Sequence, residues 1–384
     1  TMSNRQYVAR KSVADIVASG DAGQHSLNKT LGVFSITALG VGVIIGAGIF
    51  VLTGTAAAKY AGPGVMLSFI LAGLACAFVG LCYAELAAAR LDNLMVLVKL
   101  VVVVAFIGFG VSAVNAGHWM PFVPDNTGTF GEFGLSGVLR ASSVVFFAYI
   151  GFDAVSTAAQ EARNPQRDMP RGILGSLLIC TLLYVAVAAV LTGLVPYQEL
   201  NVPDPMALGI DVIQMPWLSL LVKFGALAGL TTVILVLLYG QSRIFFSMSR
   251  DGLLPPMFSR VHRATGTPYL SQISIGVVVA AIAGLFPIHV LGEMVSIGTL
   301  FAFVLVCIAV LYLRRTEADA PRPFRVPGVP FVPFIGIGFC VLLMAALPAD
   351  TWLRLVVWLA IGLAIYFGYG QHHSVHARGA GQAR

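Results

Sequence analysis

Long apolar stretches separated by short polar segments run through most of the chain, and ten of them have the length of a membrane-spanning helix. Such a helix needs about 20 predominantly apolar residues. The predicted spans cover residues 31–54, 64–88, 93–114, 137–160, 172–195, 216–247, 271–287, 291–313, 328–347 and 351–369. The pattern predicts an all-α polytopic membrane protein with a transmembrane domain over 31–369, a polar N-terminal arm over 1–30 and a polar tail over 370–384.

Composition and charge agree with this class of protein. Hydrophobic residues make up 58% of the chain and charged residues only 10%, against about 25% charged residues in ordinary globular domains. If the first span starts inside, eighteen of the 23 Lys and Arg residues fall on the cytoplasmic side, as the positive-inside rule requires. We therefore expect a multi-pass protein of the cell (inner) membrane with both termini cytoplasmic. The net charge of +6 reflects this placement and does not indicate a nucleic-acid partner. The arm lacks the apolar core of a signal peptide, so we expect no cleaved signal.

The first span is interrupted by glycines near its middle, where Gly46-Ala47-Gly48 follows Gly40 and Gly42. Each glycine costs a helix roughly 1 kcal/mol relative to alanine. Irregular backbone at membrane depth is tolerated only where it is buried in protein or lines a cavity. The run therefore predicts a broken helix at a ligand site. Close helix packing through the small residues Gly42 and Gly46 is the alternative.

The fourth span, residues 137–160, carries Gly151 and Asp153 in its interior. A charged residue at this depth normally faces a cavity or a partner. Asp153 could instead cap a new half-helix beginning at Ala154, which would also break the span. Two Gly-interrupted spans indicate the site of a secondary transporter. Half-helix N-termini offer N–H groups to a carboxylate, and freed carbonyls can take an ammonium, so the pair suits a zwitterion.

Other polar residues give weaker indications. The chain shows no Ser/His/Asp, HExxH or P-loop arrangement, so we expect neither an enzyme nor an ATP-driven pump, and no cofactor or metal. The cysteines lie in apolar runs and match no metal-ligand spacing, which favours a packing role. Three histidines, at 372, 373 and 376, could bind a metal but are more typical of a solvated tail.

Three ordered motifs resemble the amino acid–polyamine–organocation (APC) superfamily, and bacterial relatives of cationic amino acid transporters in particular. They read GVGVIIGAGIFVLTG at 40–54, FFAYIGFDAVSTAAQEARNPQRDMPRGI at 146–173 and RIFFSMSRDGLLPPMFSRVH at 243–262. The resemblance runs from about Leu31 to about Phe367. It implies a LeuT-type fold, in which two inverted repeats of five helices have broken first helices and two peripheral helices follow.

The resemblance also implies roles for particular residues. The break at Gly46, Ala47 and Gly48 would receive the substrate's α-carboxylate and α-amino groups, with Ile45 beside it. Phe147, Ala148 and Ile150 would line the pocket, and Asp153 would lie near a basic or polar substrate side chain.

Lys99 matches a lysine that proton-coupled members of the family place on their fifth helix, where it stands in for a sodium ion. Desolvation disfavours the charged form of a lysine, so such a group can exchange protons. The alternative is that Lys99 extends to the nearby cytoplasmic surface. Glu85, near the inner end of the second span, is a weaker candidate of the same kind.

The chain departs from the family pattern at Ala89-Arg90-Leu91, which joins two helices that are otherwise separated by two more spans. The third and fourth family helices are therefore expected to be missing. The leading hypothesis is a proton-coupled amino acid symporter that works by alternating access on neutral or cationic amino acids. The competing hypothesis is a degenerate permease that serves as a non-transporting subunit, and a small membrane subunit is a further candidate partner.

Overall fold

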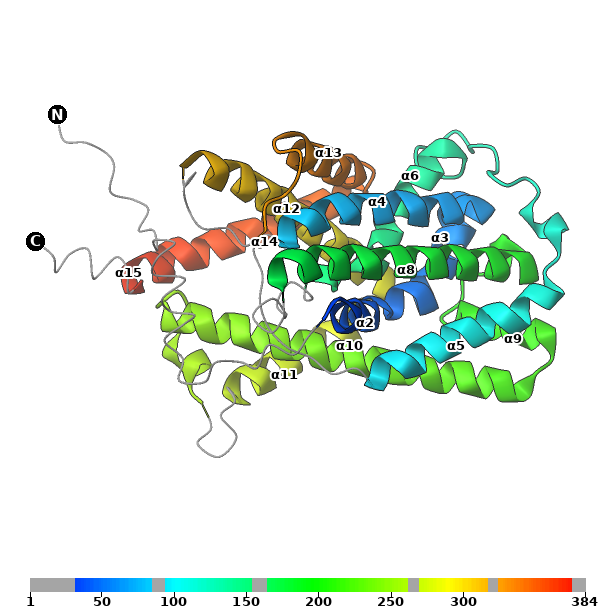
Figure 1. Cartoon of the computed structure of the whole chain (residues 1–384), viewed down its shortest axis with the longest axis horizontal. Helices are drawn as coiled ribbons and strands as arrows, with labels where there is room; N and C mark the ends of the chain where they lie inside the picture. Colours follow the sequence, from blue (N-terminus) through cyan, green and yellow to red (C-terminus); the bar gives the residue numbers. More distant parts are fainter. Residues whose placement is uncertain (1–31, 85–93, 154–163, 262–268, 317–323, 375–384) are drawn as a thin grey trace, which may run out of the picture. The chain divides into compact units, whose positions relative to one another are not determined.

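The computed structural model describes residues 32–84, 94–153, 164–261, 269–316 and 324–374 (Figure 1). These residues form helices and connecting loops, with no β-strand among them. The principal α-helices are α2 (Val33–Ile44), α4 (Val65–Ala84), α5 (Leu94–Gly110), α6 (Gly134–Val145), α8 (Pro165–Leu194), α9 (Pro205–Ile213), α10 (Pro216–Arg250), α11 (Tyr269–Leu285), α12 (Ile288–Thr316), α13 (Phe331–Ala345) and α14 (Ala349–Ile365). Every predicted span overlaps one of them, and α9 lies in a connector.

Short 3₁₀-, π- and α-helical segments lie between and after the principal helices. After α2 the chain forms the π-helix η1 (Gly48–Leu52), the short helix α3 (Thr53–Ala56), the π-helix η2 (Ala57–Ala61) and the 3₁₀ turn η3 (Gly62–Gly64). The remaining pieces are η4 (Val111–Ala113), η5 (Ala116–Trp119), η6 (Phe146–Tyr149), η8 (Tyr197–Glu199), η9 (Pro256–Ser259), η10 (Tyr366–Gly370) and α15 (Gln371–His373).

Within the described residues, five helical stretches are long and apolar enough to cross a membrane. They are Gly48–Phe78, Arg167–Leu194, Pro216–Arg250, Ile288–Thr316 and Ala349–His373. Shorter apolar helices occur at Val33–Ile44, Lys99–Ala113, Gly134–Tyr149, Leu270–Leu285 and Phe331–Ala345. The helices thus carry the apolar surface expected of a multi-pass membrane protein.

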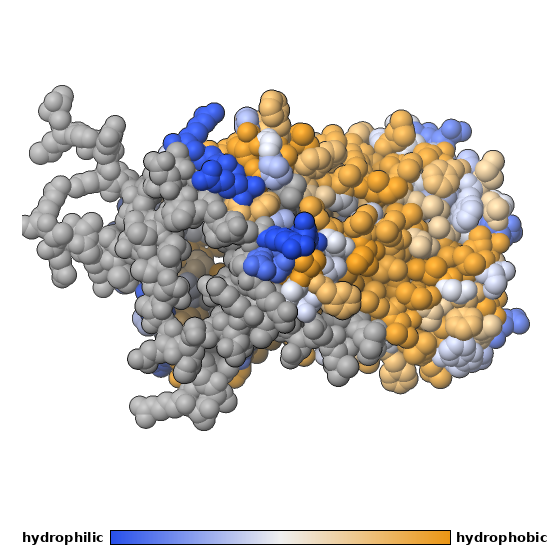
Figure 2. All heavy atoms as spheres, in the orientation of Figure 1, coloured by the Kyte–Doolittle hydropathy of each residue, from blue (hydrophilic) through white to orange (hydrophobic). Residues whose placement is uncertain are grey.

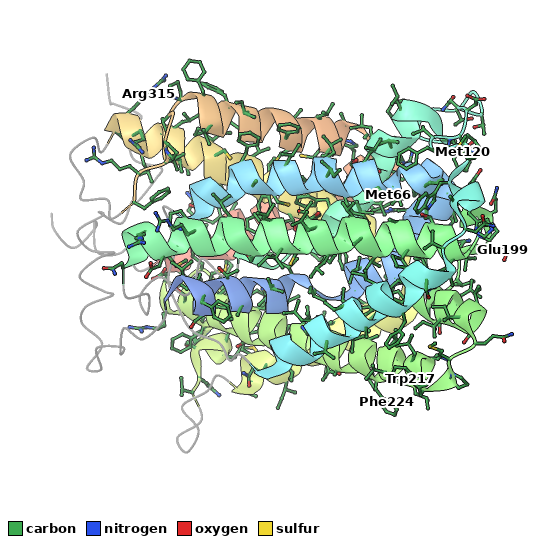
Figure 3. All side chains as sticks on the ribbon, turned by 45° about the vertical axis from the view of Figure 1, so that its right-hand side comes forward. Met66, Met120, Glu199, Trp217, Phe224 and Arg315 are labelled. Atoms are coloured by element: carbon green, nitrogen blue, oxygen red, sulfur yellow. The ribbon has the colours of Figure 1, made fainter. Side chains whose placement is uncertain are left out.

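Large apolar side chains are exposed along these helices. Hydrophobic residues cover much of the described surface in Figure 2. In Figure 3, Trp217 and Phe224 project outward from α10, and they are 53% and 68% exposed. Soluble monomers rarely expose contiguous apolar patches larger than a few hundred Å², whereas a lipid-facing surface requires them.

The chain divides into two compact units. Among the described residues, the larger unit falls within Lys29–Ile234 and Ile288–Trp352, and the smaller within Leu235–Pro287 and Leu353–Arg384. In the larger unit α8 is the central helix, since it contacts α2, α4, α5 and α9. In the smaller unit η9 contacts α11, and the His373 ring stacks on Tyr369 with 4.2 Å between ring centroids.

The connector between α5 and α6 is ordered by its own polar groups. Asn126 Nδ2 donates to the main-chain oxygens of Thr129 and Glu132, at 2.9 and 2.8 Å. The Phe133 N–H donates to the carbonyl of Tyr60 at 2.8 Å, which ties the connector to the end of η2. The Asn126 bonds satisfy carbonyls within the loop, and the Phe133 bond satisfies a carbonyl at the end of η2 that would otherwise lack a partner. The connector thereby holds the start of α6 against η2.

Candidate functional site

The first break lies at Ile45 and Gly46. Helix α2 ends at Ile44, and Ile45 has extended backbone angles, with φ −69° and ψ 102°. Ala47 is already helical, and Gly48 opens the π-helix η1. The predicted break over Gly46–Gly48 is thus placed slightly too late, because the β-branched Ile45 leaves the helix while Gly48 stays inside one.

The second break lies at Ile150 and Gly151, inside the predicted span 137–160 and at the glycine that the sequence indicated. Helix α6 tightens into the 3₁₀ turn η6, and Ile150 then becomes extended, with ψ 129°. Gly151 has φ +118°, a conformation that glycine adopts readily and other residues rarely do. Asp153 Oδ1 accepts the Gly151 N–H at 3.1 Å. The carboxylate thus caps main chain at the break. The half-helix expected to begin at Ala154 lies outside the described residues.

The two interrupted spans lie directly against each other beside their breaks. A methyl group added at Gly48 would overlap both the main chain and the side chain of Ala148. A Cβ at Gly151 would lie 2.6 Å from Val43 Cγ1. Glycine at these two positions therefore allows the main chains of the two interrupted spans to come into contact. This contact brings the predicted site residues at 45–48 close to those at 147–153.

The predicted lining residues differ in their exposure. Ile45, Gly46, Gly48 and Ala148 are buried, and the half-buried positions are Ala47, Phe147, Ile150 and Asp153. A third helix also reaches the first break, because a Cβ at Gly46 would lie 3.2 Å from Val233 Cγ2 on α10. The sequence analysis did not identify Val233, which looks like any other valine of an apolar span.

Tyr184 on α8 bridges the two breaks. Its hydroxyl lies 2.9 Å from the carbonyl oxygen of Ile44 and 3.0 Å from that of Ala148, so its single proton can serve either. The side chain is fully buried. A tyrosine in an apolar span indicates only that its hydroxyl needs a hydrogen-bond partner. The sequence does not indicate which carbonyl groups accept that bond.

A cluster of three aromatic rings supports this bridge. The Tyr184 ring centroid is 5.4 Å from those of Phe69 and Tyr149. The Tyr149 hydroxyl lies 2.9 Å from the Phe69 carbonyl oxygen and 3.1 Å from Thr181 Oγ1. The second break is therefore fixed to both α4 and α8.

Lys99 on α5 points into the protein. It is 1% exposed, and its Nζ donates to the carbonyl oxygen of Gly42 at 2.6 Å. Gly42 belongs to the last turn of α2 before the first break. On the other side, a Cβ at Gly229 of α10 would lie 3.6 Å from Lys99 Cε. The ammonium thus lies against the first broken span rather than extending to a membrane surface. Glu85, the weaker candidate, lies outside the described residues.

We expect Tyr184→Phe to lower the thermal stability of the purified protein. The substitution removes the hydroxyl between the Ile44 and Ala148 carbonyls, and an unsatisfied buried polar group costs about 1–3 kcal/mol. Thermal unfolding in detergent measures the change. Tyr366→Phe is the control, because that ring is 42% exposed. An unaltered unfolding midpoint for Tyr184→Phe would show that the bridge does not stabilise the breaks.

The fold and the site define a class: a helical membrane protein in which two interrupted spans meet at their breaks. A family model described as amino acid permease matches residues 87–365. The chain belongs to this family, within the APC superfamily.

Several characterised proteins are similar over nearly their whole length. The branched-chain amino acid permease BcaP of Bacillus subtilis (strain 168) is 37% identical, with 95% of this chain and 98% of that protein covered. A methylthioribose transporter of the same organism is 36% identical, with 93% and 96% covered. The chloroplastic cationic amino acid transporter 9 of Arabidopsis thaliana is 31% identical, with 93% and 90% covered. These relatives are transporters rather than enzymes.

Proposed function

We propose that this protein is a secondary active transporter that moves amino acids across the cell membrane by proton-coupled symport. The observation that supports this proposal most directly is that the two interrupted spans meet at Gly48 and Ala148, beside their breaks. Main-chain N–H and C=O groups freed at such breaks can bind a charged substrate without a charged side chain. Family membership supports amino acid transport independently of this geometry.

In this proposal the first break receives the amino acid backbone. The N–H groups that begin the outer half of the first span, from Ala47 onward, would bind the α-carboxylate. Carbonyls on the other side of the break would take the α-ammonium. The carbonyl oxygens of Ile44 and Ala148 each have two lone pairs, so a bond from Tyr184 still leaves capacity for a second donor. Phe147, Ile150 and Asp153 would border the substrate side chain.

The proposed architecture is the LeuT type, with alternating access and both termini in the cytoplasm. Lys99 would couple transport to protons, because its ammonium binds the last turn before the first break. Loss of its proton would release Gly42 and alter that break. The membrane domain would extend over 31–369, between a cytoplasmic arm and a cytoplasmic tail.

A second candidate, a non-transporting permease-derived subunit, is favoured by one observation. The alignment with the methylthioribose transporter runs over 453 positions but includes 93% of this 384-residue chain, so about 96 positions have no counterpart here. That length suits two spans with their loops. The family match begins at residue 87, beside Ala89-Arg90-Leu91. We infer that the third and fourth family helices are missing at this junction.

Uptake into proteoliposomes tests the two candidates against each other. The purified protein is reconstituted, and accumulation of a radiolabelled amino acid mixture is followed with and without an inward proton gradient. Transport predicts accumulation above empty vesicles that the gradient increases. Uptake equal to that of empty vesicles under both conditions would leave the subunit as the better explanation.

A further inference from the structure

The names of the relatives indicate three different kinds of substrate: a branched-chain amino acid, a cationic amino acid and a thio-sugar. The residues at the two breaks distinguish among these substrate classes. Val43 packs against Gly151, and Val233 packs against Gly46. Ile45 and Ile150 belong to the breaks themselves, and Phe147 lies in η6 just before the second break. The side chains presented where the spans meet are thus predominantly aliphatic or aromatic.

The charged side chains at the breaks, Lys99 and Asp153, form hydrogen bonds with main-chain groups of the protein. Lys99 Nζ donates to the Gly42 carbonyl at 2.6 Å. Asp153 Oδ1 accepts the Gly151 N–H at 3.1 Å, and the residue makes a further interaction. One positive and one negative group therefore stand at the two breaks, each holding the main chain of the span that it contacts.

This arrangement favours some substrates over others according to their net charge. A zwitterion with an uncharged side chain adds no net charge to the site. Lys99 and Asp153 already balance each other at the breaks, so a lysine or arginine substrate would add a net positive charge that neither side chain compensates. An uncompensated charge at membrane depth is costly, so we expect the site to prefer an uncharged side chain over a cationic one at least tenfold.

We infer that the site takes a zwitterionic amino acid with an uncharged, apolar side chain, and that Val233 limits the size of that side chain. The inference rests on the proposed transport function and adds a substrate class to it. Val233 lies on α10, and a Cβ at Gly46 would lie 3.2 Å from its Cγ2, so its methyl groups border the break proposed to hold the substrate backbone. A thio-sugar has neither the carboxylate nor the ammonium for which the opened main chain is suited.

Competition in proteoliposomes tests the substrate class. Uptake of radiolabelled leucine is measured against increasing unlabelled valine, isoleucine, methionine, lysine, arginine and methylthioribose. We expect the apolar amino acids to compete at concentrations at least tenfold lower than lysine, arginine or the thio-sugar. Equal or stronger competition by lysine, arginine or methylthioribose would overturn the inference while leaving transport itself established. If none of these compounds is taken up when each is labelled, both the inference and the proposed function fail.

Two variants of Val233 test the size limit and the charge argument. Val233→Ala should shift the preference at least threefold from valine towards phenylalanine, because it removes two methyl groups beside Gly46. Val233→Asp should raise competition by lysine relative to leucine at least tenfold, because it supplies a countercharge. Ile234→Ala is the matched control, since Ile234 is the next residue of α10 and is 60% exposed. Unchanged relative potencies in Val233→Ala, with uptake retained, would show that this side chain does not border the substrate.

Discussion

Gly48→Leu is expected to reduce amino acid uptake at least tenfold while leaving the protein inserted in the membrane. Even the first carbon of a side chain at Gly48 would overlap the main chain of Ala148. Main chain cannot rotate away as a flexible side chain can, so the two breaks would have to separate. Overpacking of this kind typically costs 1–3 kcal/mol, and occasionally more, and here the displacement falls on the proposed site itself.

The measurement is uptake by Gly48→Ala and Gly48→Leu in proteoliposomes, with membrane insertion checked by fractionation. Gly108→Leu is the control, because a Cβ at Gly108 on α5 would meet no atom within 4 Å. We expect a graded loss, with leucine worse than alanine, and an unchanged control. Normal uptake and substrate binding in Gly48→Leu would show that close contact between the breaks is not required for transport.

The positions of the helices could be predicted from the sequence because the membrane imposes a strong and local constraint. An apolar run of sufficient length must satisfy its backbone groups internally, and within a single span only a helix does so. The predicted span 291–313 therefore corresponds to α12, and 328–347 to α13. The ends are less exact, since α12 already begins at Ile288 and continues to Thr316.

The helix breaks were also predictable, but only approximately. Glycine within an apolar run marks an interruption because it weakens the helix. It does not specify which neighbouring residue leaves the helical conformation. At the second break Gly151 itself has the positive φ. At the first break Ile45 becomes extended, and Gly48 is needed instead for its contact with Ala148.

The contacts between spans were not predictable from the sequence alone. Tyr184 and Val233 lie on helices that carry neither an interruption nor a charge near these positions. Their importance comes from where α8 and α10 pack, and periodicity within one helix does not encode that. Lys99 was identified because a lysine in an apolar span is unusual, yet its bond to Gly42 depends on how α5 packs beside α2.

Lys99→Ala is expected to abolish the stimulation of uptake by a proton gradient while substrate binding persists. In the proposed mechanism a protonated Lys99 holds the Gly42 carbonyl, and loss of the proton releases the last turn of α2. Alanine cannot hold this carbonyl in any protonation state, so the first break would no longer respond to the gradient. Hydrogen bonds to charged groups contribute about 1.5–3 kcal/mol, so the variant should also be less stable.

Lys99→Arg distinguishes the role of Lys99 in proton transfer from its role as a hydrogen-bond donor. Arginine can donate to the Gly42 oxygen but does not release its proton in proteins, so this variant should keep more stability than Lys99→Ala and still lose gradient-driven accumulation. Lys223→Ala is the control for loss of a positive charge, because Lys223 on α10 is exposed. Initial uptake rates are compared with and without an inward proton gradient, alongside thermal unfolding. If both Lys99 variants accumulate substrate in response to the gradient as the unmodified protein does, Lys99 serves structure alone and another group must carry the proton.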